Sequence, residues 1–196
     1  MSIRTNYEKW YEGDAYYWGL EPGRFLEELI ELCPPSADKK VLDIGCGEGK
    51  DAVYMAQKGY DVTAFDLTEN GIRKTVSLSE KRNVNINAYV DDINTFRTDE
   101  QFDIIYSTGT VQYLFEENKK GFFEKLDKIT KKNGIVYINV FSVHKHRKLV
   151  RDVSLRPLGS LRLFTQLSFT KTHLSKIIAE WFSAALPFRF CEAKSH

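Results

Sequence analysis

The fold of this chain is decided by residues 41–50, Val41-Leu42-Asp43-Ile44-Gly45-Cys46-Gly47-Glu48-Gly49-Lys50. The apolar residues of 41–44 are typical of a strand that is buried on both faces. The glycines that follow let the backbone turn sharply and approach a ligand where a Cβ would clash. Residues 50–58 then predict a helix that stops at Gly59 and points its free N–H groups and partial positive charge at the loop. Together these features predict a cofactor site of the nucleotide type.

The glycine spacing separates two classes of cofactor. Dinucleotide-binding loops follow G-x-G-x-x-G, whereas this loop reads G-x-G-x-G, and Lys50 stands where the third glycine would be needed. Asp43 precedes the loop, where it would repel a pyrophosphate. S-adenosylmethionine carries a sulfonium, an ammonium and a ribose diol, and these groups suit carboxylates. Asp66 ends the β-rich stretch 61–66, so it is placed to accept the ribose hydroxyls.

Strands and helices alternate along the rest of the chain. The pattern predicts helices over 23–32, 69–81 and 118–130 and further strands over 86–90, 102–107 and 135–141. In the helix over 69–81, Ile72 and Val76 are predicted to share the buried face, and Asn133-Gly134 is predicted to stop the helix over 118–130. The fold class is therefore α/β, a Rossmann-like doubly wound and mostly parallel sheet with helices on both faces.

The quoted residues also resemble a known family. The run from Val41 to Asp66 resembles the cofactor-binding half of the class I S-adenosylmethionine-dependent methyltransferases. Its continuation to Asp91-Asp92-Ile93-Asn94, the aromatic opening over 16–22 and the segment 106–114 are similar to the tellurite-resistance (TehB-like) branch. The resemblance covers about residues 7 to 141. It implies the class I methyltransferase fold and methyl transfer that leaves S-adenosylhomocysteine.

The cofactor site is expected to run along the carboxyl ends of the strands. The resemblance places Asp92 near the adenine amino group, Ile93 against the ring, and the backbone after the fourth strand near the methionine part. The predicted cofactor-binding residues are Asp43, Gly45, Cys46, Gly47, Gly49, Asp66, Leu67, Asp92, Ile93, Ser107 and Thr108. Simpler roles remain open for three carboxylates: Asp43 could bond loop amides, Asp66 could cap the next helix and Asp92 could cap a turn.

The substrate side is less well marked in the sequence. Tyr11 and Trp18 are candidates to cover the sulfonium, because aromatic faces attract cations, and Tyr113 is a third candidate. The N-terminal aromatic residues could equally form a hydrophobic flap. Arg24 is a candidate to hold an anion. No general base is evident, so the predicted acceptor is already nucleophilic: a metalloid oxyanion such as tellurite or selenite, a thiol or a small amine.

Composition predicts one domain over 1–196, with an N-terminal aromatic lid and helix (1–33), a cofactor-binding core (38–141) and a basic C-terminal segment (142–196). The last segment carries a charge of +7 and the remainder −6, and the net charge of +1 argues against a nucleic-acid partner. Three cysteines predict no disulfide framework, and His144-x-His146 has no evident third metal ligand. We expect no membrane span, no metal and a cytoplasmic location, and the oligomeric state stays open.

Two other classes of protein remain possible. One is a protein that binds S-adenosylmethionine without catalysis, and the other is a nicotinamide-dependent oxidoreductase, against which the missing third glycine argues. In the C-terminal segment the pattern predicts a helix over 170–182 and a strand over 188–192. The glycine-containing, histidine-bearing last strand of the TehB type is absent from the sequence. Whether this segment forms the usual closing strands is left open.

Overall fold

A computed structural model describes residues 2–139 and 166–170 of the chain. Its helices are α1 (Ile3–Trp10), α2 (Phe25–Leu32), α3 (Lys50–Gln57), α4 (Glu69–Lys81) and α5 (Glu116–Ile129), with a short 3-10 helix at Val111–Tyr113. Its strands are β1 (Lys40–Ile44), β2 (Asp61–Asp66), β3 (Asn87–Val90), β4 (Phe102–Thr108), β5 (Thr130–Asn139) and β6 (Gln166–Thr170). Strands and helices alternate, as the sequence predicts.

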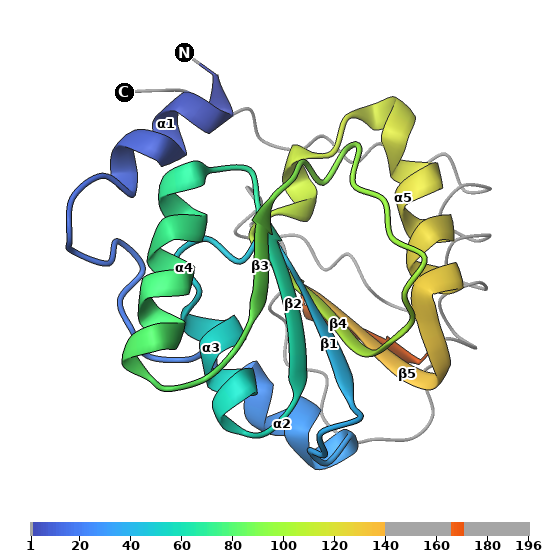
Figure 1. The fold of residues 1–196 in the computed structure, drawn as a ribbon. Coiled ribbons are helices and arrows are strands. Elements are labelled where there is room, and N and C mark those ends of the chain that lie inside the picture. Colours follow the sequence, from blue (N-terminus) through green and yellow to red (C-terminus); the bar gives the residue numbers. More distant parts are fainter. Residues whose placement is uncertain (1, 140–165, 171–196) are drawn as a thin grey trace, which may run out of the picture.

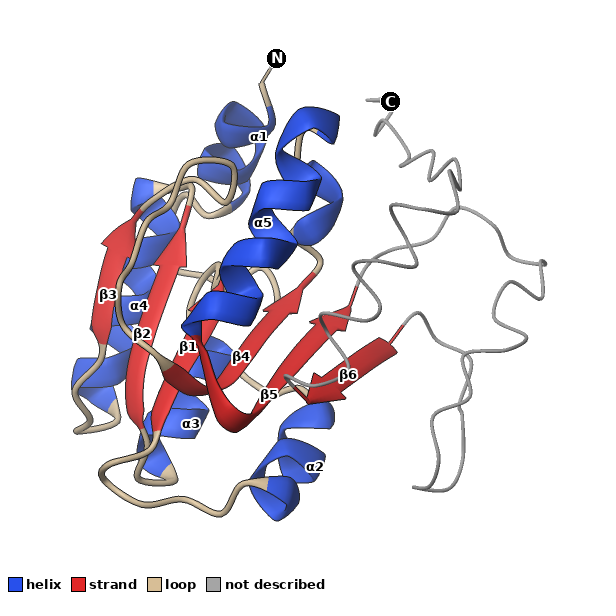
Figure 2. Ribbon diagram, turned by 90° about the vertical axis from the view of Figure 1, so that its right-hand side faces the viewer, coloured by secondary structure: helices blue, strands red, loops and turns tan. Residues whose placement is uncertain are grey.

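The strands form one sheet in the order β3-β2-β1-β4-β5-β6 (Figure 1). The first five are parallel, and β6 runs antiparallel to β5. Helices α2, α3 and α4 cover one face and α5 lies on the other (Figure 2). The strand order reverses between β1 and β4, so their carboxyl ends open a crevice where doubly wound folds bind ligands. The Rossmann-like fold class predicted from the sequence is confirmed.

The core has one apolar layer on each face of the sheet. Leu42 and Ile44 belong to the layer beneath α5, while Val41 packs in the layer beneath α2 and α3. This alternation follows from the pleat of the strand, which points successive side chains to opposite faces. Strand β1 is therefore buried on both sides, and it fixes the start of the glycine loop relative to both layers of helices.

Helix α4 has the predicted ends but not the predicted buried face. Val76 is 39% exposed, whereas Gly71, Lys74, Thr75 and Leu78 are buried. The reason is a close approach between α4 and the glycine loop, since a Cβ on Gly71 would lie 2.7 Å from the Gly47 carbonyl oxygen. Small and polar residues suit this contact better than branched apolar ones. The prediction that Ile72 and Val76 share the buried face therefore fails for Val76, whereas Ile72 is half-buried.

The connection from α5 to β5 also differs from the prediction. The helix ends at Ile129, and Asn133 lies inside β5 with a φ of 67°. Pairing with β4 jumps from Phe102 opposite Thr130 to Ile104 opposite Ile135, so Asn133 and Gly134 belong to an irregularity of the strand. Asn133 does have a left-handed backbone, as a helix-stop residue would, but it lies at the irregularity in β5 and does not end the helix.

Strand β6 completes the described part of the sheet. It pairs with β5 from Ile135 opposite Thr170 to Asn139 opposite Gln166. The predicted helix is wrong at its first residue, because Thr170 ends a strand. The rest of that helix, the predicted strand over 188–192 and the pair His144 and His146 lie outside the described residues. Within 2–139 and 166–170 no helix is both long and apolar enough to cross a membrane.

Candidate cofactor-binding site

The glycine loop between β1 and α3 is held in a conformation that only glycine adopts easily. Gly45, Gly47 and Gly49 have φ values of 79°, 56° and 85°. A Cβ on Gly45 would lie 2.0 Å from Thr110 Oγ1, and one on Gly49 would lie 2.5 Å from Thr75 Oγ1. The loop is therefore packed tightly between the segment after β4 and helix α4. Neither threonine was among the predicted site residues, although Thr110 lies in the segment 106–114 that carries the family resemblance.

Backbone hydrogen bonds tie this loop to the neighbouring strand. The N–H groups of Gly45 and Cys46 both donate to the Phe65 carbonyl, at 2.8 and 3.0 Å. Burial, reinforced by the charges of Asp43 and Asp66, raises the pKa of the Cys46 thiol well above its ordinary value. A thiol in this setting stays protonated at neutral pH, so Cys46 is a small loop residue and not an activated nucleophile.

Asp66, at the end of β2, joins the loop to the start of α4. Its Oδ2 accepts the Gly47 N–H at 2.9 Å, and its Oδ1 accepts the Thr68 N–H at 2.9 Å and the Thr68 hydroxyl at 2.7 Å. Burial raises the pKa of this carboxyl, and these hydrogen bonds oppose the shift. A carboxylate offers about four acceptor positions, so one direction remains for a ligand hydroxyl. The predicted ribose contact stays a prediction, and the loop contact is an additional role.

Asp43 lies in a buried cluster of polar groups beside the loop. Burial, followed by the nearby charge of Asp51, raises the pKa of Asp43 well above its ordinary value. Asp51 itself accepts the Gly23 N–H at 2.7 Å and the Lys50 ammonium at 2.8 Å. The Tyr106 hydroxyl is fully buried and interacts with the Asp43 carboxyl beside it, but it makes no hydrogen bond of standard geometry within the described residues. The cluster thus keeps a carboxyl and a hydroxyl with unused hydrogen-bonding capacity.

The predicted residues after β3 and β4 make structural contacts. Asp92 Oδ1 accepts the Asn94 N–H at 2.8 Å and the Asn94 side-chain amide at 3.0 Å, so it caps a turn. Ile93 is buried in the apolar layer beneath α5. Ser107 is buried and donates to the Ile44 carbonyl at 2.9 Å. Their contacts with a cofactor, like those of the half-buried Leu67 and Thr108, stay predictions.

The N-terminal lid, defined here as residues 3–22, lies over the loop. Tyr11 is buried, accepts the Trp18 indole N–H at 2.9 Å, and its hydroxyl would lie 3.0 Å from a Cβ on Gly47. The Tyr7 and Tyr113 hydroxyls hydrogen-bond at 2.9 Å. The structure therefore brings three of the predicted substrate-side residues, Tyr11, Trp18 and Tyr113, to the same region through Tyr7, a lid residue whose contact with Tyr113 was not predicted.

Arg24 does not join this group by any contact within the described residues. It is the exposed N-cap of α2, and the neighbouring Gly23 N–H bonds to Asp51. Its proposed role toward an anion therefore rests on its place near the edge of the site and not on an observed contact. Trp18, by contrast, is 46% exposed and presents part of its ring to solvent at the lid.

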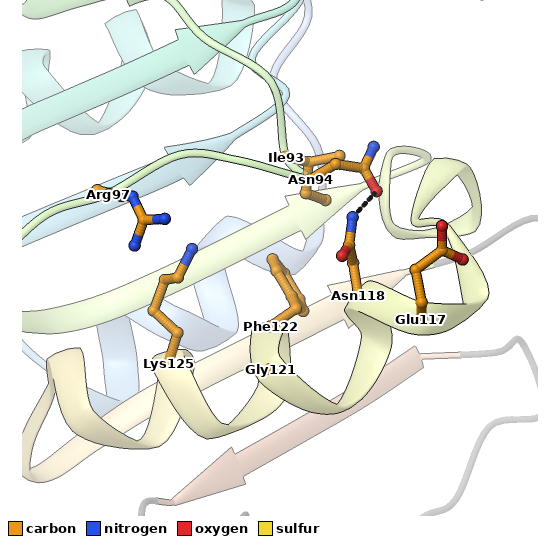
Figure 3. Close-up of a pocket in the computed structure, with 8 residues that line it drawn as sticks. All are labelled: Ile93, Asn94, Arg97, Glu117, Asn118, Gly121, Phe122 and Lys125. Carbon is orange, nitrogen blue, oxygen red and sulfur yellow. Dashed lines mark hydrogen bonds between the residues drawn. The ribbon is translucent and has the colours of Figure 1, made fainter.

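A separate pocket of about 280 Å³ lies between the loop after β3 and helix α5 (Figure 3). Asn118 donates to Asn94 at 3.3 Å on its floor, and Lys125 extends toward Arg97 at its other end. Burial, followed by the charge of Arg97, lowers the pKa of Lys125. The pocket is lined by Ile93, Asn94, Arg97, Glu117, Asn118, Gly121, Phe122 and Lys125. It lies beneath α5, and none of its lining residues belongs to the glycine loop.

The chemistry of the site fits S-adenosylmethionine. Gly45, Gly47 and Gly49 let the loop backbone come close to a ligand, and the buried Asp43 and half-buried Asp66 place carboxyl groups at the ends of β1 and β2. The Tyr106 hydroxyl has unused hydrogen-bonding capacity. A ligand with an ammonium, a sulfonium and a ribose matches these groups, whereas a pyrophosphate would face two carboxylates.

Three comparisons with known proteins agree with this chemistry. Residues 23–146 match the family model described as tellurite resistance protein TehB. The probable S-adenosyl-L-methionine-dependent methyltransferase TehB of Haemophilus influenzae (strain 10810) is 37% identical over 107 residues, which cover 55% of this chain and 37% of that protein. The ubiquinone biosynthesis O-methyltransferase of Rickettsia bellii (strain OSU 85-389) is 27% identical over 163 residues, covering 76% of this chain and 67% of that protein.

The solved structures agree as well. The crystal structure of TehB from Haemophilus influenzae matches with a TM-score of 0.55 and 30% sequence identity, covering 69% of this chain and 44% of that chain. The fold is that of the class I S-adenosylmethionine-dependent methyltransferases. Within this class the chain belongs to the TehB family, because the family model matches more than half of it. The resemblance recognised in the sequence is confirmed, although the match spans only 37% of the curated TehB protein from Haemophilus influenzae.

Proposed function

We propose that this protein transfers a methyl group from S-adenosylmethionine to a small nucleophilic acceptor. The observation that carries the proposal is the pairing of a loop with three left-handed glycines, Gly45, Gly47 and Gly49, with Asp43 and Asp66 at the adjacent ends of β1 and β2. These carboxylates suit a cofactor with a cationic end, and membership of the TehB family supports the same activity. A nicotinamide cofactor would place its anionic pyrophosphate near these carboxylates, which would repel it.

Each part of the site would hold a different part of the cofactor. Asp66 has one acceptor direction left for a ribose hydroxyl, and Asp43 with Tyr106 offers a carboxyl and a hydroxyl to the ammonium end. When bound, the cofactor supplies an electrophilic methyl group on a positively charged sulfur. Aromatic rings of the lid would cover this charge and exclude water from it.

The protein's own groups favour an acceptor that needs no general base. Burial raises the pKa values of Tyr7 and Tyr11, so both phenols stay protonated at neutral pH. Protonated phenols can donate hydrogen bonds but cannot remove a proton from an acceptor. Proximity, alignment and exclusion of water would then supply the rate acceleration.

We infer three classes of acceptor that meet this condition: a metalloid oxyanion such as tellurite or selenite, a thiol and a small amine. The name of the TehB family supports the first class. The relative from Rickettsia bellii is named as an O-methyltransferase, so oxygen acceptors occur among the similar proteins. A water-soluble acceptor of this kind fits action in the cytoplasm without a nucleic-acid or membrane partner.

The experiment that tests the proposal is calorimetric titration with S-adenosylhomocysteine, with NAD as the comparison ligand. Binding of the first and not the second is expected. Turnover is then measured with tellurite, selenite, a thiol and an amine. Binding without methylation of any acceptor would instead favour a cofactor-binding protein without catalysis, and preference for NAD would overturn the proposal.

A further inference from the structure

A buried ion pair links the glycine loop to helix α4. Lys74 Nζ lies 2.7 Å from Glu48 Oε1, and the two side chains are only 3% and 1% exposed. Glu48 stands between two glycines of the loop, whereas Lys74 faces the loop from α4. A buried ion pair is weak evidence for stability, because desolvation offsets much of the attraction. The other hydrogen bonds of Lys74 and Glu48 are therefore a better guide to the role of the pair than their mutual attraction is.

Those remaining bonds go to the N-terminal lid. Lys74 Nζ also donates to the Ala15 carbonyl, and Glu48 Oε2 accepts the Trp18 N–H at 3.1 Å. The ammonium also lies 5.4 Å from the centre of the Tyr16 ring. The two charged groups thus hold both ends of the segment 15–18 by its backbone, one through a carbonyl and the other through an N–H group.

A short chain of contacts then returns from this segment to the loop. The Trp18 indole donates to the Tyr11 hydroxyl at 2.9 Å, and this hydroxyl would lie 3.0 Å from a Cβ on Gly47. Gly47 and Glu48 are adjacent, so the lid contacts the loop at both residues. A movement of the loop on ligand binding would shift Glu48 and with it the anchor of the lid.

We propose that Glu48 and Lys74 are positioning residues that fix segment 15–18 of the lid over the glycine loop and couple closure of the lid to occupancy of the cofactor site. This inference rests on the proposed function, because it takes the loop as the cofactor cradle. Neither residue needs to touch the reacting atoms. A ligand that orders the loop orders the lid through Glu48, and by linkage an ordered lid strengthens binding of the ligand.

The first test uses the wild-type protein. Amide hydrogen exchange over residues 15–19 is measured with and without saturating S-adenosylhomocysteine, and the ligand is expected to slow this exchange by about tenfold. Normal ligand binding with unchanged exchange in this segment would overturn the inference alone. No binding of S-adenosylhomocysteine by the wild-type protein would overturn the proposed function and this inference with it.

The second test uses variants. Lys74→Met is expected to weaken S-adenosylhomocysteine binding about tenfold and to abolish the ligand-dependent protection of 15–19. Lys74→Met leaves the Glu48 carboxylate buried without its partner, which could prevent folding. The double variant Glu48→Gln/Lys74→Met removes both charges and avoids this problem, and it should lose the same ligand-dependent protection of residues 15–19. Lys39→Met is the control, since it removes a lysine that pairs with Asp103 at 3.1 Å, before β1 and away from the lid. Equal protection in the double variant and the wild type would contradict the proposed coupling.

Discussion

Asp66 offers the most informative single perturbation of the site. Its carboxylate accepts hydrogen bonds from Gly47 N–H, Thr68 N–H and Thr68 Oγ1, at 2.9, 2.9 and 2.7 Å. Asp66→Ala would leave two backbone donors without their partner, while the hydroxyl can rotate. An unsatisfied buried donor costs about 1 to 3 kcal/mol, so we expect a loss of about 2 to 6 kcal/mol in the free energy of unfolding. The same change should weaken binding of S-adenosylhomocysteine.

Two assays separate these effects. Urea unfolding gives the stability, and calorimetric titration below the unfolding transition gives the affinity. Asp61→Ala is the matched control, because Asp61 begins the same strand, is 54% exposed and reaches Lys40 only at 3.8 Å, so a change below about 1 kcal/mol is expected. An Asp66→Ala protein with unchanged stability would refute the loop-anchoring role, and unchanged affinity would refute the ribose role.

Three further predictions concern the same site. Gly45→Ala should lower the free energy of unfolding, measured in urea, by about 2 to 4 kcal/mol, because the Gly45 backbone is left-handed and the new Cβ would overlap Thr110. Adding Thr110→Ala should recover part of this loss. If the stability changes of the two variants simply add, the contact between them is contradicted. Tyr106→Phe should change unfolding stability by less than about 1 kcal/mol yet weaken S-adenosylhomocysteine binding, because the lost hydroxyl makes no hydrogen bond of standard geometry in the described protein; unchanged affinity would show that it does not meet the ligand. Burial raises the pKa of Asp43 in the folded protein above its value of about 3.9 in the unfolded chain. The protonated carboxyl therefore contributes to stability below about pH 3.9, and this contribution is lost as the pH rises through the pKa of the folded state. Asp43→Asn should therefore unfold at higher urea concentration than the wild type at neutral pH, and lower stability at that pH would contradict the assignment.

Much of the fold followed from local patterns. The apolar run of β1, the glycines after it and the alternation of elements predicted the parallel sheet, because each signal is contained in a few consecutive residues. The ends of α4 were also predicted from sequence. Its N-cap is Thr68, whose hydroxyl accepts the Gly71 N–H, and not Asp66, which the sequence left as a possible cap. The buried face of that helix was not predicted, because it depends on how closely the glycine loop approaches.

The site divides in a similar way. Asp43, Asp66 and the loop glycines were predicted as site residues from sequence, because strand ends and glycine spacing mark them directly. The contacts of Thr75, Thr110 and Tyr7 were not predicted, because they depend on distances between distant segments, such as the 2.9 Å from Tyr7 to Tyr113. Asp92 illustrates the opposite case, since its place after β3 was predicted but its observed bonds are those of a turn.

The sequence by itself determined the fold class, the family and the cofactor-binding loop, because these follow from periodicity, glycine spacing and motif residues. Only the tertiary structure decided that Asp66 also bonds to the loop, that the Tyr106 hydroxyl is buried beside Asp43 without a hydrogen bond of standard geometry in the described residues, and that Glu48 and Lys74 bond to the backbone of segment 15–18. These features arise where the carboxyl ends of β1, β2 and β4 converge with α4 and the N-terminal lid. Such convergence brings together residues with no sequence relation, and burial then sets their pKa values and hydrogen bonds.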